Sequence, residues 1–327
     1  MKVVVLHTAE ALDPPPDPVI EQIHAALAAA GHSPSLLAVG SDVEPVVAGL
    51  RAAGPDLVFN LAESFGGKSA LESNVAALLN LLGLRYTGSS PAGLLLAGDK
   101  SLTKKILRLH DIRTPEFATF YRGALDWAGD LAFPVIVKPP QEDASIGISS
   151  SSVVGDLKEL FGKIDELQSQ FQAPVLVEEF VDGREFYVGV LGNVSPEALP
   201  AIELDFSALP SGRPRIASWE AKWGTDGQGA GEEFAGTKSV FPEGIEPELV
   251  ARMQTVAVES FQALRLRDYA RIDLRVTESG DVYVIEVNPN CYLERESEFA
   301  RAAARSGLTY EALISRIVDL ASARYAR

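Results

Sequence analysis

In the first quarter of the chain, short apolar runs alternate with longer segments of helical periodicity. Residues 3–6 are an apolar run of strand length, and residues 57–60 are a similar run that ends in asparagine. Residues 19–30 and 71–82 repeat apolar side chains at helical spacing and are each followed by a glycine. Such runs are typical of buried strands, and a glycine after a periodic segment is a helix stop signal. Alternating strands and helices predict an α/β layer around a parallel sheet.

The rest of the chain mixes strands and helices without a regular alternation. Helical periodicity covers residues 100–109 and 157–171, and strand-like runs cover residues 133–138, 174–178, 185–190 and 202–204. We therefore predict three domains. They are an N-terminal α/β domain over residues 1–90, which ends in a Gly-Ser-Ser-Pro loop, a central domain over 91–177 and a C-terminal mixed-sheet domain over 178–327.

The most informative pattern lies between residues 271 and 288, where apolar and polar residues alternate on both sides of a Ser-Gly turn signal. Alternation of period two is typical of a half-buried strand, and two such runs joined by a short turn predict a β-hairpin. A two-residue turn between Glu278 and Asp281 sets a register in which Asp273 faces Glu286.

This register opposes two like charges, which is unfavourable by up to about 1 kcal/mol. Arg271 and Asn288 share the face, because strand residues two apart point to one side. Two carboxylates and an amide oxygen are hard oxygen ligands, so Asp273, Glu286 and Asn288 predict a Mg²⁺ site that keeps waters and meets substrate phosphates. The alternative is a solvated hairpin face whose charges point apart.

Composition is that of an ordinary globular protein and narrows the classes of partner. The 327 residues include 46% hydrophobic and 23% charged residues, with a formal net charge of -16, which opposes binding to nucleic acid or to anionic membranes. The single cysteine, Cys291, excludes an intramolecular disulfide, and the four histidines show no zinc-ligand spacing. No apolar run has the length of a signal peptide or a membrane span. We expect a cytoplasmic protein.

Three lysines stand where a positive charge needs a partner. Lys138 ends an apolar strand and precedes a Ser-rich run that begins at Ser145, whose backbone N–H groups and hydroxyls suit phosphate oxygens. Lys100 begins a helix, and Lys222 lies between two tryptophans in a Gly-rich loop with the composition of a lid. The alternatives are a strand-end lysine that extends to solvent, a solvated Lys100 and an ordinary surface loop around Lys222.

The segment Glu178-Glu179-Phe180-Val181 follows a buried-type strand, and we interpret it as an exposed crossing between two units. Backbone groups at such a crossing suit the edge of an adenine, and a nearby carboxylate, Glu185, suits ribose hydroxyls. The alternative is a charged turn.

The order of these features resembles the ATP-grasp superfamily and, within it, the D-alanine–D-alanine ligase group. The resemblance runs from about residue 55 to the end of the chain. The matching segments are Tyr86-Thr-Gly-Ser-Ser90, Asp99-Lys100, Pro134-Val-Ile-Val-Lys-Pro139, Val175-Leu-Val-Glu178, Glu185-Phe186, Glu220-Ala-Lys222, Arg271-Ile-Asp273 and Glu286-Val-Asn288. The resemblance implies an α/β (α+β) ATP-grasp fold that holds ATP between the central and C-terminal domains. It also implies a ligase that joins a carboxylate to an amine through an acyl phosphate.

The resemblance also implies a role for each matching residue. Lys100, Lys138 and Lys222 would contact nucleotide phosphates, Glu178, Glu179, Phe180 and Val181 would hold the adenine, and Glu185 the ribose. Asp273, Glu286 and Asn288 would bind two Mg²⁺ ions, or Mn²⁺ in their place. Arg271 would stabilise the oxyanion of the tetrahedral intermediate, and Ser297 would contact the carboxylate of the second amino acid. Homodimers are common in this group.

Several substrate positions depart from the pattern of the group. Ala144 replaces a serine, Trp223 replaces a lid tyrosine, Asn290-Cys291-Tyr292 replaces a Ser-Pro-Gly turn, and Glu10 is the nearest substitute for an amine-binding glutamate. The expected enzyme therefore ligates either D-alanine or a different amino acid, dipeptide or natural-product substrate. Two alternatives from other classes are a nucleotide-binding regulatory module without turnover and a divalent-cation binder that does not use ATP.

Overall fold

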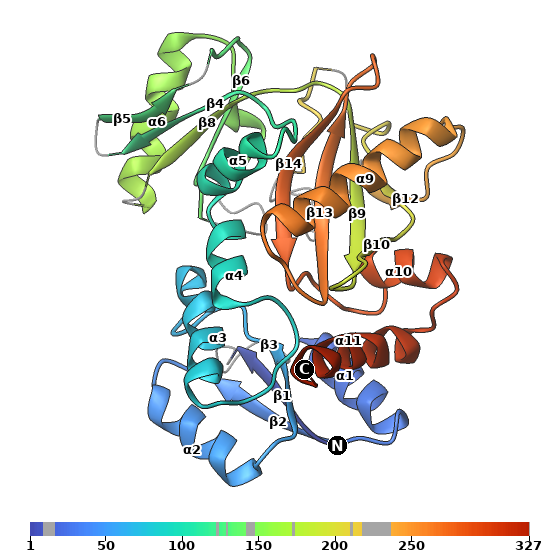
Figure 1. Ribbon diagram of the computed structural model, residues 1–327. Coiled ribbons are helices and arrows are strands. Elements are labelled where there is room, and N and C mark those ends of the chain that lie inside the picture. Colours follow the sequence, from blue (N-terminus) through green and yellow to red (C-terminus); the bar gives the residue numbers. More distant parts are fainter. Residues whose placement is uncertain are drawn as a thin grey trace.

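The computed structural model contains three β-sheets with their helices (Figure 1). It describes residues 1–8, 17–121, 124–128, 130–141, 148–171, 174–209, 212–217 and 237–326. The sheet at the bottom of Figure 1 comes from the beginning of the chain, the five-stranded sheet is at the upper left and the six-stranded sheet at the upper right. Among the residues described, no helix has the length and apolar character that a membrane crossing requires.

The N-terminal sheet is parallel, as the alternation of strands and helices predicts, and its strand order is β2-β1-β3. Its elements are β1 (Lys2–Thr8), α1 (Pro18–Ala29), β2 (Ser33–Val39), α2 (Val43–Ala53), β3 (Leu57–Leu61), the 3-10 helix Ser69–Leu71 and α3 (Glu72–Leu81). Gly31 and Gly83 follow α1 and α3 with φ of +80° and +67°, so the predicted glycine stops are confirmed. β2 lies outside the predicted elements because its side chains are mostly exposed and form no buried apolar run.

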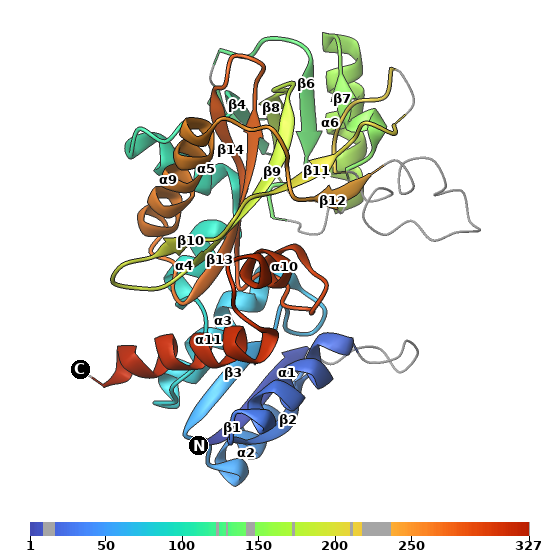
Figure 2. The same ribbon diagram turned by 90° about the vertical axis from the view of Figure 1, so that its right-hand side faces the viewer.

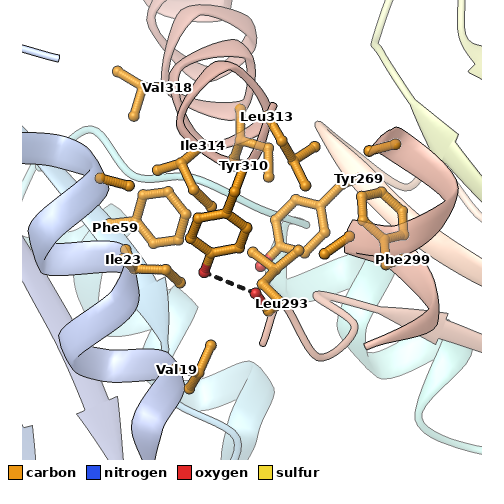
Figure 3. Packing of buried hydrophobic residues seen from close by; sticks show 14 of the residues in the cluster. Val19, Ile23, Phe59, Tyr269, Leu293, Phe299, Tyr310, Leu313, Ile314 and Val318 are labelled. Atoms are coloured by element: carbon orange, nitrogen blue, oxygen red, sulfur yellow. Dashed lines mark hydrogen bonds between the residues drawn. The ribbon is translucent and has the colours of Figure 1, made fainter. Parts of the chain in front are cut away.

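The first and last helices of the chain share one hydrophobic core. α10 (Glu298–Arg305) and α11 (Tyr310–Tyr325) bring the chain back to the N-terminal sheet, where α11 packs against α1 (Figures 1 and 2). Ile23 of α1 and Phe59 of β3 belong to the same buried cluster as Ile314 of α11 (Figure 3). The Tyr310 hydroxyl donates a hydrogen bond to the carbonyl of Leu293 at 2.9 Å. The end of the chain therefore completes the core of its beginning.

The central sheet is antiparallel, with the strand order β5-β4-β8-β6-β7. Its elements are β4 (Phe117–Tyr121), β5 (Ala124–Ala128), β6 (Val135–Lys138), the 3-10 helix Ser150–Ser152, β7 (Val153–Val154), α6 (Leu157–Phe171) and β8 (Val175–Glu179). Val135 and Val137 of β6 form a buried cluster with Leu160 and Ile164 of α6. Because strand side chains alternate in direction, Lys138 and Glu178 lie on the other face of β6 and β8, together with Ile136 and Leu176.

The C-terminal sheet has the strand order β12-β11-β9-β13-β14, and β10 pairs with the end of β9. Its elements are β9 (Arg184–Leu191), β10 (Glu197–Ala198), β11 (Ile202–Asp205), β12 (Lys238–Val240), α9 (Pro247–Ala263), β13 (Tyr269–Val276) and β14 (Val282–Pro289). Met253 and Phe261 of α9 pack with Ile272 and Leu274 of β13 on one face. Two helices that precede the central sheet, α4 (Pro91–Ala97) and α5 (Lys100–Leu109), contact β14.

The predicted pairing of the C-terminal hairpin is confirmed, although its predicted turn is wrong. Asp273 pairs with Glu286, but the register shifts at the next residue, so that Leu274 pairs with Val284. This β-bulge leaves one extra residue in β14. The turn is also longer than two residues, because the N–H of Thr277 donates to the carbonyl of Asp281 at 3.0 Å. The bulge compensates for the longer turn and keeps the two carboxylates opposed.

A buried aspartate, Asp268, links the C-terminal helix to loops of the N-terminal and C-terminal sheets. Asp268 is fully buried, and its carboxylate accepts hydrogen bonds from both Nε and Nη2 of Arg324 in α11, at 2.9 and 2.8 Å. It also accepts from Asn193 Nδ2 and from the N–H of Gly88, both at 2.8 Å. Four bonds to one carboxylate therefore join α11, the β9–β10 turn, the loop after α3 and the start of β13.

We expect Arg324→Met to destabilise the protein, because it leaves the buried Asp268 without its cation. Breaking a buried ion pair from one side typically costs about 3–5 kcal/mol. The matched control is Arg316→Met on the exposed side of the same helix. Urea unfolding followed by circular dichroism should show a clearly lower midpoint for Arg324→Met only, and equal midpoints for the two variants would contradict this role.

Candidate active site

Helix α5 carries two buried lysines between the central and C-terminal sheets (Figure 1). The helix begins at Asp99, whose side chain accepts hydrogen bonds from the N–H groups of Ser101 and Leu102, each at 3.0 Å. Lys100 and Lys104 are one turn apart and therefore point to the same side of α5. Only 5% of Lys100 and 1% of Lys104 are exposed. The alternative of a solvated Lys100 is thus wrong.

Lys100 reaches the C-terminal sheet and pairs with Glu286. Its Nζ atom lies 2.8 Å from Glu286 Oε1, which is one of the two opposed hairpin carboxylates. A second link fixes the same end of α5, since the N–H of Lys100 donates to the carbonyl of Pro140 at 2.9 Å. The start of α5 is therefore attached both to β14 and to the segment that follows β6.

Lys104 reaches the central sheet, where it forms a buried triad with Glu178 and Lys138. Lys104 Nζ lies 3.2 Å from Glu178 Oε1, and Lys138 Nζ lies 3.1 Å from Glu178 Oε2. β6 and β8 place Lys138 and Glu178 on one face as diagonal neighbours, because Lys138 pairs with Leu176. The interpretation of Lys138 as a lysine that extends to solvent is therefore wrong. The interpretation of Glu178 as part of an exposed crossing is also wrong, because the Glu178 side chain is only 2% exposed.

Burial and the neighbouring charges set the protonation of this triad. Burial lowers the pKa of Lys104 to about 8, and Lys138 acts in the same direction, although Glu178 opposes the shift. Burial acts to raise the pKa of Glu178, but Lys104 and Lys138 outweigh it and hold that pKa below its usual value. Two cations and one carboxylate therefore share a site from which water is excluded.

Arg271 holds the other hairpin carboxylate. Its Nε and Nη2 atoms donate to the two oxygens of Asp273 at 2.8 and 2.9 Å, and Asn288 Nδ2 donates to Asp273 Oδ2 at 3.0 Å. The guanidinium also lies 4.5 Å from the ring centre of Tyr187. Burial acts to lower the pKa of Arg271, but Asp273 outweighs it, so that pKa lies well above its usual value.

The repulsion between Asp273 and Glu286 is the reason to predict a metal ion, but in this structure two protein cations neutralise it. Arg271 neutralises Asp273, and Lys100 neutralises Glu286. The alternative of charges that point apart to solvent is wrong, since both carboxylates have a cation partner and Asp273 is 2% exposed. Relief of repulsion alone therefore gives no reason for a metal at this position.

The donor set nevertheless fits Mg²⁺. Asp273, Glu286 and Asn288 offer oxygen donors on one face of paired strands, and Asp273 and Glu286 are directly opposed. Within the described part of the chain no cluster of three or more His, Cys, Asp or Glu residues suits a metal ion. A site with only two carboxylates suits an ion whose remaining ligands are waters and phosphate oxygens, as is usual for Mg²⁺.

Glu185, the predicted ribose ligand, is buried on the same face of the C-terminal sheet. Its Oε2 accepts a hydrogen bond from Arg275 Nη2 at 2.6 Å, and its Oε1 accepts one from the Tyr187 hydroxyl at 3.1 Å. Phe180 and Val181 are half-buried after the end of β8, where the N–H of Phe180 donates to the carbonyl of Pro134 at 2.9 Å. Glu179, the last residue of β8, is also half-buried.

A small cavity of about 60 Å³ lies where the hairpin meets the N-terminal sheet. Its lining includes Asp17, Glu63, Asn290, Cys291 and Tyr292. The Tyr292 hydroxyl donates to Asp17 Oδ1 at 2.7 Å. Burial raises the pKa of the Cys291 thiol, so this cysteine stays neutral. The substituted turn at residues 290–292 therefore lines this cavity together with the acidic residues Asp17 and Glu63.

Ser297 stands at the start of α10, and its hydroxyl donates to the carbonyl of Tyr292 at 3.2 Å. The predicted site residues Lys222 and Ser145 lie outside the described residues, as do Ala144, Trp223 and Glu10.

Sequence reasoning missed Lys104, Arg275 and Tyr187, although these side chains hold the predicted residues in place. The spacing of Lys104 could have indicated its burial, because Lys100, Lys104 and Leu107 recur at helical spacing on one face of α5, and this face is buried. Arg275 alternates with Arg271 and Asp273 on β13 and belongs to the same polar face.

This chain is similar in sequence and in fold to known proteins. A family model described as the D-ala D-ala ligase C-terminus matches residues 109–319. The uncharacterized protein y4sG of Sinorhizobium fredii is 36% identical over 82% of this chain and 75% of its own length. The D-alanine–D-alanine ligase of Chromohalobacter salexigens is 32% identical over 84% of this chain and 80% of its own length. The fold is similar to that of the D-alanine–D-alanine ligase from Bacillus anthracis complexed with ATP, with a TM-score of 0.75, 22% identity, and coverage of 98% of this chain and 97% of that chain.

The buried Lys104 should make stability depend on pH above about pH 8. Its pKa is about 8 in the folded protein against an ordinary value of 10.5, so between these values the unfolded chain binds more protons than the folded protein. The free energy of unfolding of the wild type should therefore rise with pH in this window, by up to about 3 kcal/mol. Below pH 8 both states hold the proton and this dependence disappears. Denaturant titrations of wild type and Lys104→Met should diverge above pH 8, and parallel profiles would contradict the assignment.

Proposed function

Because this chain belongs to the D-alanine–D-alanine ligase family, we propose that it activates a substrate carboxylate with ATP and joins it to the amine of an amino acid. The chain is an ATP-dependent ligase that forms peptide bonds, and it has the ATP-grasp fold. What supports the detailed proposal is the paired face of β13 and β14, where Arg271, Asp273, Glu286 and Asn288 lie together beside Lys100.

The proposed site lies between a central domain of residues 91–177 and a C-terminal domain of residues 178–327, next to an N-terminal domain of residues 1–90. Glu178, Glu179, Phe180 and Val181 would hold the adenine, and Glu185 the ribose. Lys100, Lys138, Lys222 and Ser145 would contact the phosphates. The consumption of ATP leads us to place the reaction in the cytoplasm.

In the first step, an oxygen of the substrate carboxylate attacks the γ-phosphorus of ATP, and ADP leaves. The transition state is loose and needs positioning and neutralisation of phosphate charge more than covalent help. Lys100 and Lys138 are suited to this task because their ammonium groups are buried and already desolvated. Two Mg²⁺ ions held by Asp273, Glu286 and Asn288 would supply further neutralisation of the phosphates.

In the second step, the free amine of the other substrate attacks the acyl carbon, and phosphate leaves with the electrons of the C–O bond. The proton that the nitrogen loses goes to the departing phosphate. Arg271 would stabilise the oxyanion, since a guanidinium stays charged and presents several donors in a fixed plane. Asp273 and the Tyr187 ring hold that guanidinium in place. Ser297 would bind the carboxylate of the attacking amino acid.

The cavity beside the 290–292 turn supports an amino-acid-like substrate. Asp17 and Glu63 place two carboxylates in its wall, and such groups favour an ammonium ion. Which amino acid fits is set by residues that differ from the pattern of the group. We therefore propose either D-alanine or a different amino acid or dipeptide as the carboxylate substrate.

The decisive experiment measures ADP release with Mg²⁺ and ATP against a panel of D- and L-amino acids and dipeptides, with mass detection of the products. We expect one substrate or pair to stimulate ADP release and to give a product lighter than the sum of its substrates by one water. ATP binding without stimulation by any member of a broad panel would favour a regulatory module. Calcium binding without any affinity for ATP would favour a cation binder.

Arg271→Lys should separate the two chemical steps. The variant keeps a positive charge beside Asp273 but loses the planar fork, so we expect ATP to bind normally while amide formation falls by roughly 10²–10³-fold. ADP should still be released, because the acyl phosphate then hydrolyses. The control is Arg252→Met, which removes a guanidinium that contacts Gly280 at the distant hairpin turn. Product formation near the wild-type rate in Arg271→Lys would refute the assignment.

A further inference from the structure

Lys104 has no part in the chemistry proposed above, although it is 1% exposed and paired with a proposed adenine ligand. We propose that Lys104 is a positioning residue that holds Glu178 as a buried anion while Lys138 moves from Glu178 to a nucleotide phosphate. This inference rests on the proposed binding of ATP at this site.

The geometry allows one lysine to leave without disturbing the other. Lys104 contacts Oε1 of Glu178 at 3.2 Å, whereas Lys138 contacts Oε2 at 3.1 Å. The two side chains also come from different elements, α5 and β6. Lys138 ends its strand, and its side chain, 9% exposed, is the most accessible of the three. Lys138 is therefore the lysine placed to exchange partners.

The charge of the triad shows why a second lysine is needed. With both lysines in place, two cations surround one carboxylate. Once Lys138 transfers to a phosphate, Lys104 and Glu178 remain as a neutral buried pair. Without Lys104, the same transfer would leave Glu178 buried and uncompensated, which is strongly unfavourable. The carboxyl would then either keep Lys138 from the phosphate or take up a proton.

Helix α5, which carries Lys104, is anchored, so Lys104 can stay in place while Lys138 exchanges Glu178 for a phosphate. Its neighbour one turn earlier, Lys100, is attached through its N–H to the carbonyl of Pro140 at 2.9 Å. The side chain of Asp99, which caps α5, accepts a hydrogen bond from Gln141 Nε2 at 3.1 Å. These bonds connect α5 to the segment directly after Lys138, so the helix that carries Lys104 is fixed against the central sheet.

The test compares two probes, adenosine and a non-hydrolysable ATP analogue with Mg²⁺, on the full chain by titration calorimetry. Adenosine has no phosphate and does not require Lys138 to move. We expect Lys104→Met to lower the affinity for the triphosphate analogue by roughly 100-fold or more, whereas the affinity for adenosine should change by less than about threefold. Proton uptake should accompany binding of the analogue to the variant, seen as a dependence of the binding enthalpy on the buffer.

Two further variants separate positioning from a general structural effect. Lys104→Met/Glu178→Gln removes the buried charge, so its affinity for the triphosphate analogue should return to that of Glu178→Gln alone. Lys105→Met, the next residue on α5, should behave as the wild type. Equal loss of adenosine and analogue binding, or no recovery in the double variant, would overturn the inference. So would unchanged analogue binding in Lys104→Met.

The outcome for the wild type distinguishes this inference from the proposed function. A wild-type protein that binds the triphosphate analogue, together with a Lys104→Met variant that binds it equally well, would overturn only the role of Lys104. A wild-type protein that does not bind the analogue would overturn the ATP-dependent reaction and, with it, this inference.

Discussion

The pairing of lysines on α5 with carboxylates on two different sheets is the constraint on which the candidate site depends. Lys100 binds Glu286 of the C-terminal sheet, and Lys104 binds Glu178 of the central sheet. Buried charges are tolerated only when they are paired, so the two carboxylates hold the same side of α5 from two different sheets. The two ion pairs therefore help to fix the position of these sheets, which would enclose a nucleotide, relative to each other. The Lys100 pair also keeps a cationic group in place before any ligand arrives.

A consequence of this arrangement is that ligand binding becomes an exchange of partners. Lys100 and Lys138 already have anionic partners, and the proposed metal-binding carboxylates already have cationic ones. Phosphate and divalent cation arriving together would replace both kinds of partner. A divalent cation alone would leave the buried Lys100 without an anion, and phosphate alone would take Lys100 away from Glu286. Nucleotide and metal are thus expected to bind more tightly together than separately.

Much of this site could be predicted from the sequence because it depends on local patterns. The period-two alternation around Asp273 and Glu286 predicted the hairpin, and the glycines after α1 and α3 marked the correct helix ends. The pairing of the two carboxylates agrees with the prediction only because the bulge offsets the longer turn. The burial of Glu178 could not be predicted, because it depends on Lys104, which is distant in sequence. The spacing from Val284 to Val287 could have indicated the bulge. In a regular strand, residues three apart point to opposite faces, yet both valines pack in one core.

The core shared by α1 and α11 joins segments that are far apart in the sequence. Ile23 of α1 and Phe59 of β3 lie in it together with Ile314, Ile317 and Val318 of α11. Until α11 has been synthesised and has docked, α1 covers only part of this face of the N-terminal sheet. Contacts over so long a stretch of chain form slowly, and the apolar surface that waits for them can aggregate in the meantime.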